Sequence, residues 1–259
     1  MRNRRLGVIR RYELAAADPL IEDYYGHSGF YNFGYWRDDT RDQVDASRNL
    51  IEGLLALIPE KRGAILDVAC GMGGTTGHLL KYYRPADVVG VDVTREQLLK
   101  STLNAPGCAF SAMDATHLAF RDSAFDNVIC VEAAFHFDTR ERFLCEAARV
   151  LRPGGRLVLS DILVRRWAAR LSPVSPPRNY VRDLTVYRSL CARAGFGDVE
   201  IVDATNECWK QFSRRSRRWM RERRAEGRIS RFAYAALLLR YLALDLAIRQ
   251  YVLVSATRP

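Results

Sequence analysis

The stretch ILDVACGMGGTT, residues 65–76, decides how this chain is organised. Its apolar start includes the carboxylate of Asp67, a glycine-rich turn follows, and a helical pattern begins near Gly74 and continues to about Tyr83. The order is strand, tight turn, helix. Open α/β sheets bind ligands at the carboxyl ends of their strands, and glycine lets the backbone approach a ligand closely. The stretch therefore predicts a binding site at this turn.

A second apolar run, residues 88–92, ends in the carboxylate of Asp92. Asp92 follows the glycine turn by about 20 residues, the spacing at which a carboxylate meets the two hydroxyls of a ribose. The two runs and the helix between them predict a nucleoside-binding βαβ unit.

Short apolar runs alternate with helical patterns through the rest of the chain. We expect strands at residues 64–69, 87–92, 108–111, 126–131, 156–163, 198–202 and 248–255, and helices that include 40–58, 95–103, 139–151, 181–194 and most of 206–246. This alternation predicts a parallel, doubly wound sheet covered on both faces. The predicted fold is a Rossmann-like α/β sheet of seven mostly parallel strands. Its last strand is antiparallel, and a helical cap lies over the carboxyl edge.

The composition is that of an ordinary globular protein, with 48% hydrophobic and 27% charged residues among 259. No apolar run reaches the roughly 18 residues of a membrane span, and the first arginines are not followed by the apolar core of a signal peptide. We therefore expect a cytoplasmic protein without a transmembrane segment. The six cysteines form no C-x-x-C pair, so neither a structural zinc site nor a disulfide framework is expected.

The net charge of +10 is concentrated in residues 2–11 and in an arginine-rich run, residues 214–231. A solvated helix face with a frayed terminus is one interpretation, and an anionic substrate or membrane surface is another. Trp219 is the only aromatic residue in the arginine-rich run, which weakens a nucleic-acid interpretation. Peripheral membrane contact and homo-oligomerisation both remain open.

Residues 24–36, YYGHSGFYNFGYW, combine many aromatic rings with three glycines and show neither a helical nor a strand period. A loop folded over an apolar or cationic ligand explains both features, because ring faces attract cations. An aromatic plug over the sheet edge is the alternative. We call residues 24–36 the aromatic segment.

Polar residues stand where the predicted strands end. Asp67 can orient the glycine turn or accept from an ammonium group, and Gly71 and Gly73 leave room for a ligand. Asp92 can accept from two ribose hydroxyls. Asp114 can accept from an exocyclic amine, with the Ala115 N–H available to a ring nitrogen. Together these residues would hold an adenosine and an amino-acid tail.

This set resembles the class I S-adenosylmethionine-dependent methyltransferases. Residues 67–74 look like their first motif, 90–92 like the acidic loop, 113–115 like the adenine loop and 151–157 like the signature before the fifth strand. The resemblance implies an S-adenosylmethionine site without a metal. The cofactor-binding residues that it implies are Tyr24, Tyr25, Tyr35, Asp67, Ala69, Gly71, Gly73, Asp92, Val93, Gln97, Asp114, Ala115 and Glu132.

Residues 132–137 and the Tyr24-Tyr25 pair resemble the small-molecule branch, which includes ubiquinone, sterol and natural-product methyltransferases. The substrate does not follow from the resemblance, but the aromatic segment favours a largely apolar acceptor, and we expect C- or O-methylation of such a metabolite. His136 is the candidate base, with Glu132 and Tyr25 as further catalytic candidates. The expected substrate pocket consists of Tyr31, Phe33, Trp36, Phe135 and His136.

The expected organisation is an amino-terminal helical arm and aromatic lid at 1–58, an S-adenosylmethionine-binding core at 59–165, and 166–259 completing the sheet. The last part includes a substrate cap at about 206–246. Two alternatives are an NAD-type oxidoreductase and a basic nucleic-acid-binding module with a degenerate fold. The turn lacks the third glycine of the dinucleotide fingerprint, which disfavours the oxidoreductase.

Overall fold

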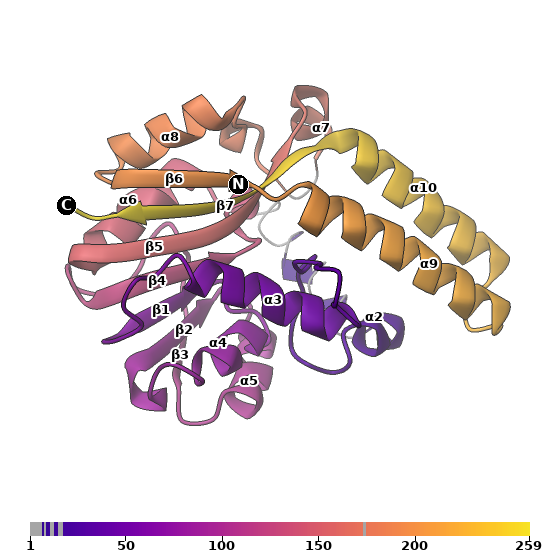
Figure 1. Ribbon diagram of the computed structural model, residues 1–259, viewed down its shortest axis with the longest axis horizontal. Coiled ribbons are helices and arrows are strands. Elements are labelled where there is room, and N and C mark those ends of the chain that lie inside the picture. Colours follow the sequence, from indigo (N-terminus) through magenta and orange to yellow (C-terminus); the bar gives the residue numbers. More distant parts are fainter. Residues whose placement is uncertain (1–6, 8, 11–12, 15–17, 173–174) are drawn as a thin grey trace.

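The computed structural model describes residues 7, 9–10, 13–14, 18–172 and 175–259. Most of residues 1–17, at the start of the expected amino-terminal helical arm, falls outside them. A single sheet forms the body of the molecule, and a helical hairpin stands out from one side of it (Figure 1). No helix in these described ranges is long and apolar enough to cross a membrane.

The sheet has seven strands in the order β3-β2-β1-β4-β5-β7-β6. Their bounds are β1 Ile65–Val68, β2 Val88–Asp92, β3 Ala109–Ala112, β4 Phe125–Val131, β5 Leu151–Val164, β6 Gly197–Asp203 and β7 Ile248–Thr257. The first five strands pair in parallel, and β7 lies antiparallel between β5 and β6. The predicted mostly parallel, seven-stranded sheet with an antiparallel last strand is confirmed.

Two of the described helices precede β1, and the others lie between successive strands. The α-helices are α2 Pro19–Tyr24, α3 Gln43–Leu55, α4 Gly74–Leu79, α5 Arg95–Asn104, α6 Arg140–Val150, α7 Arg166–Leu171, α8 Leu184–Arg193, α9 Gln211–Ala225 and α10 Arg231–Ala247. Short 3₁₀ segments are η1 Pro85–Asp87, η2 Ala134–His136 and η3 Pro177–Asn179, and η4 Asn206–Lys210 is a π-helical turn.

Polar residues fix where several helices begin. The carboxylate of Asp42 accepts from the Asp45 N–H at 2.8 Å at the start of α3, and Asp183 accepts from the Val186 N–H at 2.9 Å before α8. The Ser230 hydroxyl accepts from the Ala233 N–H at 3.2 Å before α10. Each cap satisfies a backbone donor that the first helical turn leaves free.

Two apolar clusters cover the two faces of the sheet. On one face, α6 and α8 pack against the strands through residues such as Phe143, Ala147 and Tyr187. On the other face, α3 contributes Leu50, Ile51, Leu54 and Leu55. This burial on both faces explains why the strands are almost wholly apolar.

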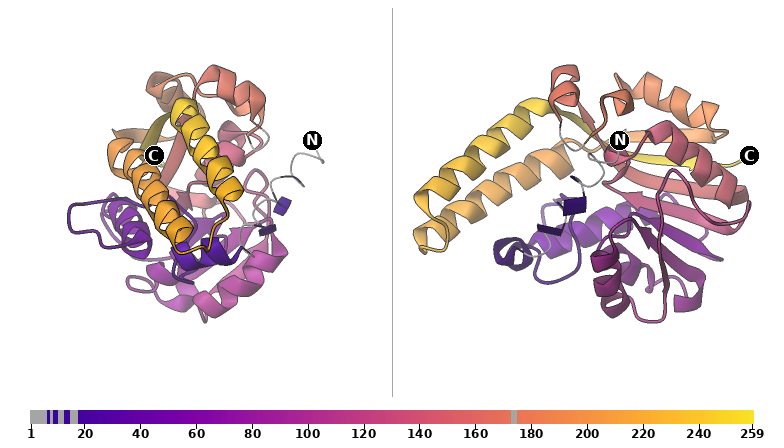
Figure 2. Two further views of the ribbon diagram at one scale, coloured as in Figure 1. Left: turned by 90° about the vertical axis from the view of Figure 1, so that its right-hand side faces the viewer. Right: turned by 180° about the vertical axis from the view of Figure 1, so that it is seen from behind.

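The second cluster continues beyond the sheet into the α9–α10 hairpin. It includes Cys208, Trp209 and Phe212 together with the buried Tyr25 and Phe30 of the aromatic segment. Figure 2 shows from two further directions that the hairpin extends away from the sheet. The base of the hairpin therefore packs on the aromatic segment.

Two elements differ from the expectation. β5 begins at Leu151, so the Pro-Gly-Gly signature lies in the strand's first residues, and Leu151 pairs with Phe125. The short helix α7 was not expected, because it has only six residues and no side-chain cap. Its existence depends on tertiary packing that a local pattern does not contain.

Candidate active site

A cavity of about 740 Å³ lies at the carboxyl ends of β1, β2 and β4. That volume is within the range of small-molecule and cofactor sites. Val68, Val91 and Val131 mark the three strand ends on its wall, and Gly29–Asn32 and Pro176–Arg178 close it from other parts of the chain. The parallel register carries the strand ends to one edge, with Val68 paired to Val91.

The glycine turn fits between two neighbouring backbones. Gly73 has φ of +83°, and a Cβ there would lie 2.8 Å from the Ser101 Cα. A Cβ at Gly74 would lie 2.6 Å from the backbone of Gly29 and Phe30, and the Gly74 N–H donates to the Gly29 carbonyl at 3.3 Å. Only glycine permits both contacts. The turn is consequently fixed to the aromatic segment.

Two non-glycine residues on the cavity wall also have left-handed backbones. They are Ala69, with φ of +61° after β1, and Glu132, with φ of +50° after β4. Such conformations are costly for residues with a Cβ and gather at functional sites. Two of the five described non-glycine residues with positive φ therefore lie where parallel strands present their carboxyl ends.

Asp92 holds the turn from the neighbouring strand. Its Oδ2 accepts from the Gly71 N–H at 3.0 Å and its Oδ1 accepts from the Thr94 N–H at 2.8 Å. Each carboxylate oxygen has a second lone pair. Asp92 lines the cavity, so its carboxylate can also accept hydrogen bonds from a ligand.

Asp67 lies behind the turn and does not line the cavity. Its Oδ2 accepts from the Thr76 hydroxyl at 2.7 Å. Burial, with a smaller contribution from the nearby Asp92, raises the pKa of Asp67 to about 7, although the hydrogen bond from Thr76 opposes the shift. Asp67 therefore orients the start of α4 instead of meeting a ligand directly.

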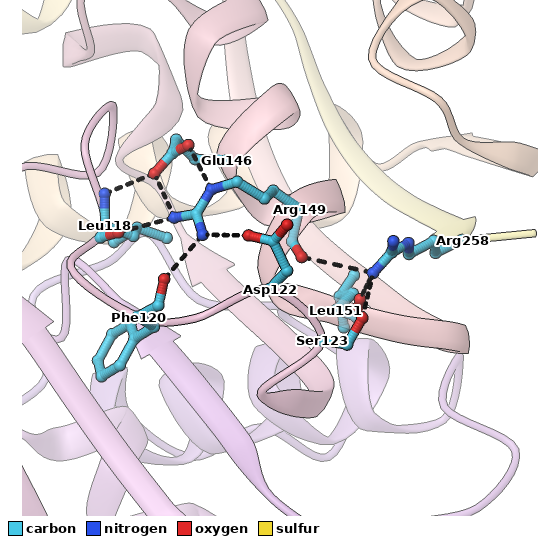
Figure 3. A network of polar contacts seen from close by, with 8 residues as sticks. All are labelled: Leu118, Phe120, Asp122, Ser123, Glu146, Arg149, Leu151 and Arg258. Carbon is cyan, nitrogen blue, oxygen red and sulfur yellow. Dashed lines mark hydrogen bonds and ion pairs between the residues drawn. The ribbon is translucent and has the colours of Figure 1, made fainter.

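Asp114 lines the cavity beyond β3, and its Oδ1 accepts from the N–H and the hydroxyl of Thr116. The chain that follows is held by Arg149 of α6 (Figure 3). The Arg149 guanidinium donates to the carbonyls of Leu118 and Phe120, each at 2.7 Å, and pairs with Glu146. This network fixes the loop on which Asp114 and Ala115 stand.

Glu132 connects the cavity wall to two distant parts of the chain. Its Oε1 accepts from the Phe33 N–H and from the Tyr251 hydroxyl, each at 2.7 Å. Burial raises the pKa of Glu132 to about 8. The carboxyl group thus joins the aromatic segment and the last strand to the end of β4.

The raised pKa of Glu132 predicts a pH dependence of stability. The folded chain binds this proton more tightly than the unfolded chain, whose Glu titrates near its ordinary value of 4.5. The Glu132 contribution to the free energy of unfolding should therefore fall as pH rises from about 4.5 to about 8, and then stay constant. We expect urea unfolding to show a wild-type stability that declines across this window relative to Glu132→Gln. Parallel curves for the two proteins would contradict the shift.

His136 lies on η2 and lines the cavity. A buried network positions this turn: the Asn179 side chain donates to the Ala134 carbonyl at 2.9 Å, and the Arg140 N–H donates to Asn179 Oδ1 at 2.6 Å. Arg140 also forms a bidentate pair with Asp161 at 2.6 and 3.1 Å. The network fixes both η2 and the adjacent Pro176–Arg178 wall.

The structure brings many of the predicted site residues to one cavity. The lining residues among them are Tyr31, Ala69, Gly71, Asp92, Val93, Gln97, Asp114, Ala115, Glu132 and His136. The predicted residues that do not line it are Tyr24, Tyr25, Phe33, Tyr35, Trp36, Asp67, Gly73 and Phe135.

The rings that do not reach the cavity pack elsewhere. Phe33 stacks on Phe212, with ring centroids 4.6 Å apart, and Tyr24 contacts Trp219 at 5.1 Å. The Tyr25 hydroxyl donates to the Asn32 carbonyl at 2.9 Å. These rings hold Tyr31 and Asn32 at the wall. No described residue of 206–246 lines the cavity.

Sequence reasoning missed several wall residues, namely Ile9, Asn32, Met72, Thr75 and Pro176–Arg178. The Ser-Pro-Pro pattern before Arg178 contains no local sign that the chain returns to the strand ends there. Asn32 stands between the aromatic residues and could have been noticed for its polar side chain.

The charges of the cavity favour a cationic ligand. Among the described lining residues, Asp92, Asp114, Glu132 and Asp138 carry carboxyl groups, whereas Arg178 alone carries a permanent positive charge and pairs with Asp138. Buried carboxyl groups are stabilised in their charged form by a nearby cation. The wall therefore fits S-adenosylmethionine, whose sulfonium and ammonium groups are positive, and Asp92 fits its ribose.

Comparison with known proteins gives matches in sequence and in structure. A family described as a methyltransferase domain matches residues 66–159. Methyltransferase GfsG of Streptomyces halstedii is 34% identical over 193 residues, covering 68% of this chain and 69% of that protein. The O-methyltransferase cnsE of Penicillium expansum is 31% identical over 192 residues, covering 68% of each.

Among solved structures, the [4+2]-cyclase SpnF superposes with a TM-score of 0.74 and 20% identity, covering 96% of this chain and 95% of that one. This likeness concerns the fold, and a fold does not by itself set the reaction. The matched family region, by contrast, contains Asp67, Asp92, Asp114, Glu132 and His136.

Proposed function

This chain belongs to the class I S-adenosylmethionine-dependent methyltransferases, and on that premise we propose that it methylates a hydroxyl group of a small, largely apolar metabolite. The cavity carries the proposal: its carboxyl groups suit the cofactor, and its remaining wall is mainly apolar, with Phe30, Tyr31, Met113 and Phe137. The oxidoreductase and nucleic-acid interpretations receive no support from the matched proteins.

We assign the cofactor to the strand ends. Asp92 would accept from the ribose hydroxyls, Asp114 and the Ala115 N–H would meet the adenine, and the turn from Ala69 to Gly71 would lie along the amino-acid tail. When bound, S-adenosylmethionine supplies a methyl group on a sulfonium, which is displaced in line by a nucleophile. The protein contributes to the reaction by aligning the acceptor with the methyl group and by excluding water from the site.

O-methylation is favoured over C-methylation by two observations. His136 lines the cavity, where an imidazole can take the proton of an acceptor hydroxyl. Most rings of the aromatic segment turn away from the cavity, so fewer ring faces are available to a carbocation. One of the relatives is, by its name, an O-methyltransferase.

The domain organisation and the cellular location are proposed as well. We propose a core at 59–165, with 1–58 and 166–259 completing the site, in which residues 206–246 support the aromatic segment. A cytoplasmic location is also proposed.

The proposal is tested with a methyl donor labelled in its methyl group. The protein is incubated with this donor and a metabolite extract, and labelled products are identified by mass spectrometry. We expect a labelled ether of an apolar metabolite. A label found only on carbon or nitrogen would overturn the O-methylation, and no labelled product from any extract would count against a small-molecule acceptor.

His136→Ala is expected to lower kcat by roughly 10²–10⁴-fold with the acceptor so identified, because the acceptor hydroxyl loses its base. The affinity for the cofactor, measured by calorimetry, should be unchanged. The residual rate should rise with pH, because hydroxide and ionisation of the acceptor then replace the imidazole. Wild-type turnover in His136→Ala would exclude its role as the base.

A further inference from the structure

The last helix of the hairpin exposes an apolar row. Phe232, Leu239, Leu242 and Leu246 of α10 are exposed by 81%, 67%, 45% and 66%, respectively. Their spacing of seven, three and four residues places them on one face of the helix. No residue of α10 is buried. An apolar helix of this length usually buries such a face against another element.

An arginine row lies on the neighbouring helix. Arg214, Arg218 and Arg221 of α9 are exposed and share one face. The opposite side of α9 carries Phe212 and Trp219, which pack on Tyr24 of the body. The arginine row therefore points away from the body. Glu222 pairs with Arg218 at 3.0 Å and lies beside this row.

The two rows lie side by side. Asp245 of α10 accepts from the Ser213 hydroxyl at 2.9 Å and pairs with Arg217 at 3.2 Å, which joins the two helices near the base of the hairpin, and beyond it the helices run beside each other (Figure 1). Tyr241 and Leu244 of α10 pack toward the body, so its apolar row also points outward. We call Arg214, Arg218, Arg221, Phe232, Leu239, Leu242 and Leu246 the outer hairpin face.

A second group of exposed side chains stands at the base of the hairpin. The Arg165 guanidinium donates to the Leu246 carbonyl at 3.1 Å, and α7 follows directly (Figure 1). On α7, Trp167 is 48% and Leu171 is 77% exposed, beside the exposed Arg166 and Arg170. The pairing of apolar and arginine side chains thus recurs next to the end of α10.

We infer that the outer hairpin face docks on an anionic phospholipid surface. A helix that lies in a membrane interface buries apolar side chains at the boundary of the acyl chains, while arginines meet the anionic headgroups. Both requirements are met here by adjacent rows. An apolar protein partner would offer no anionic groups to the arginines, and a nucleic acid would offer no apolar surface to the leucines. The inference is independent of which metabolite is methylated.

The test is sedimentation of the full chain with vesicles. One set contains phosphatidylglycerol and phosphatidylcholine in equal parts, and the other contains phosphatidylcholine alone. We expect binding to the anionic vesicles that weakens as salt is added. Arg214→Ala/Arg218→Ala/Arg221→Ala should weaken it roughly a hundredfold, because each arginine near the surface contributes about a factor of five. Leu239→Gln/Leu246→Gln should weaken it about tenfold or more.

Matched variants control for charge and hydrophobicity. Leu99→Gln/Leu103→Gln removes two leucines of α5 that are exposed by 71% and 80%. Arg121→Ala/Arg142→Ala/Arg188→Ala removes three exposed arginines from other elements. The leucine control should bind as the wild type does, and the arginine control should lose much less affinity than the α9 variant.

Three results would overturn the inference. The first is no binding to anionic vesicles. The second is binding that the outer-face variants and their controls weaken equally. The third is a dimer in light scattering that Leu239→Gln/Leu246→Gln dissociates, because the apolar row would then be an interface between two copies of this chain.

Discussion

Replacing Asp92 with alanine is expected to lower the affinity for S-adenosylmethionine a hundredfold or more. The variant removes the carboxylate proposed to accept from both ribose hydroxyls, and hydrogen bonds to a charged group contribute about 1.5–3 kcal/mol each. It also frees the Gly71 N–H, which Asp92 holds at 3.0 Å, so the glycine turn loses its support. Calorimetric titration with the cofactor measures the loss.

Two controls separate binding from folding. Asp92→Asn retains an acceptor of the same shape without the charge, so an intermediate loss of affinity is expected. Asp87→Ala removes a carboxylate on η1 that pairs with Arg84 at 2.7 Å outside the cavity, and cofactor affinity should be unaffected. An Asp92→Ala protein that unfolds like the wild type and binds the cofactor equally well would disprove the assignment.

Replacing Asp161 with alanine is expected to lower the free energy of unfolding by about 3–5 kcal/mol. Asp161 is 0% exposed and pairs with Arg140, which is 3% exposed. The Tyr187 hydroxyl also donates to Asp161 Oδ2 at 2.9 Å. The variant leaves the buried guanidinium charge without its carboxylate partner, and that is more costly than the absence of both groups.

Urea unfolding tests this expectation with two comparisons. Arg140→Met/Asp161→Leu removes both charges and should recover much of the stability that Asp161→Ala loses. Glu141→Ala breaks the exposed pair with Arg193 and should cost about 0–1 kcal/mol. Equal losses for the buried and the exposed pair would contradict the argument.

Much of the fold follows from local pattern. The run ending at Val68, the glycines after it and the carboxylate of Asp92 are close in sequence, and parallel strands carry them to one edge. The glycine turn, β2 and the loop after β3 could therefore be placed before the structure was known. Other residues of the cavity wall, such as Ala69, Val91 and Ala115, belong to these same three segments.

The aromatic segment could not be placed in the same way. An aromatic side chain can line a ligand-binding cavity or pack in the hydrophobic core. Which of the two it does depends on residues that are far away in the sequence. Phe33 packs on Trp209 and Phe212, and its N–H donates to Glu132. The wall at Pro176–Arg178 is similar, because the position of Asn179 depends on Arg140 and Ala134.

The position of β7 affects the order in which the nascent chain folds on the ribosome. β6 is bonded only to β7 within the sheet, and Tyr251 of β7 holds Glu132 on the cavity wall. During synthesis, the amino-terminal strands can pair long before residue 248 emerges, whereas β6 and the Glu132 contact must wait for it. The hydrogen bond that fixes Glu132 on the cavity wall therefore forms only after β7 has left the exit tunnel and paired with β5.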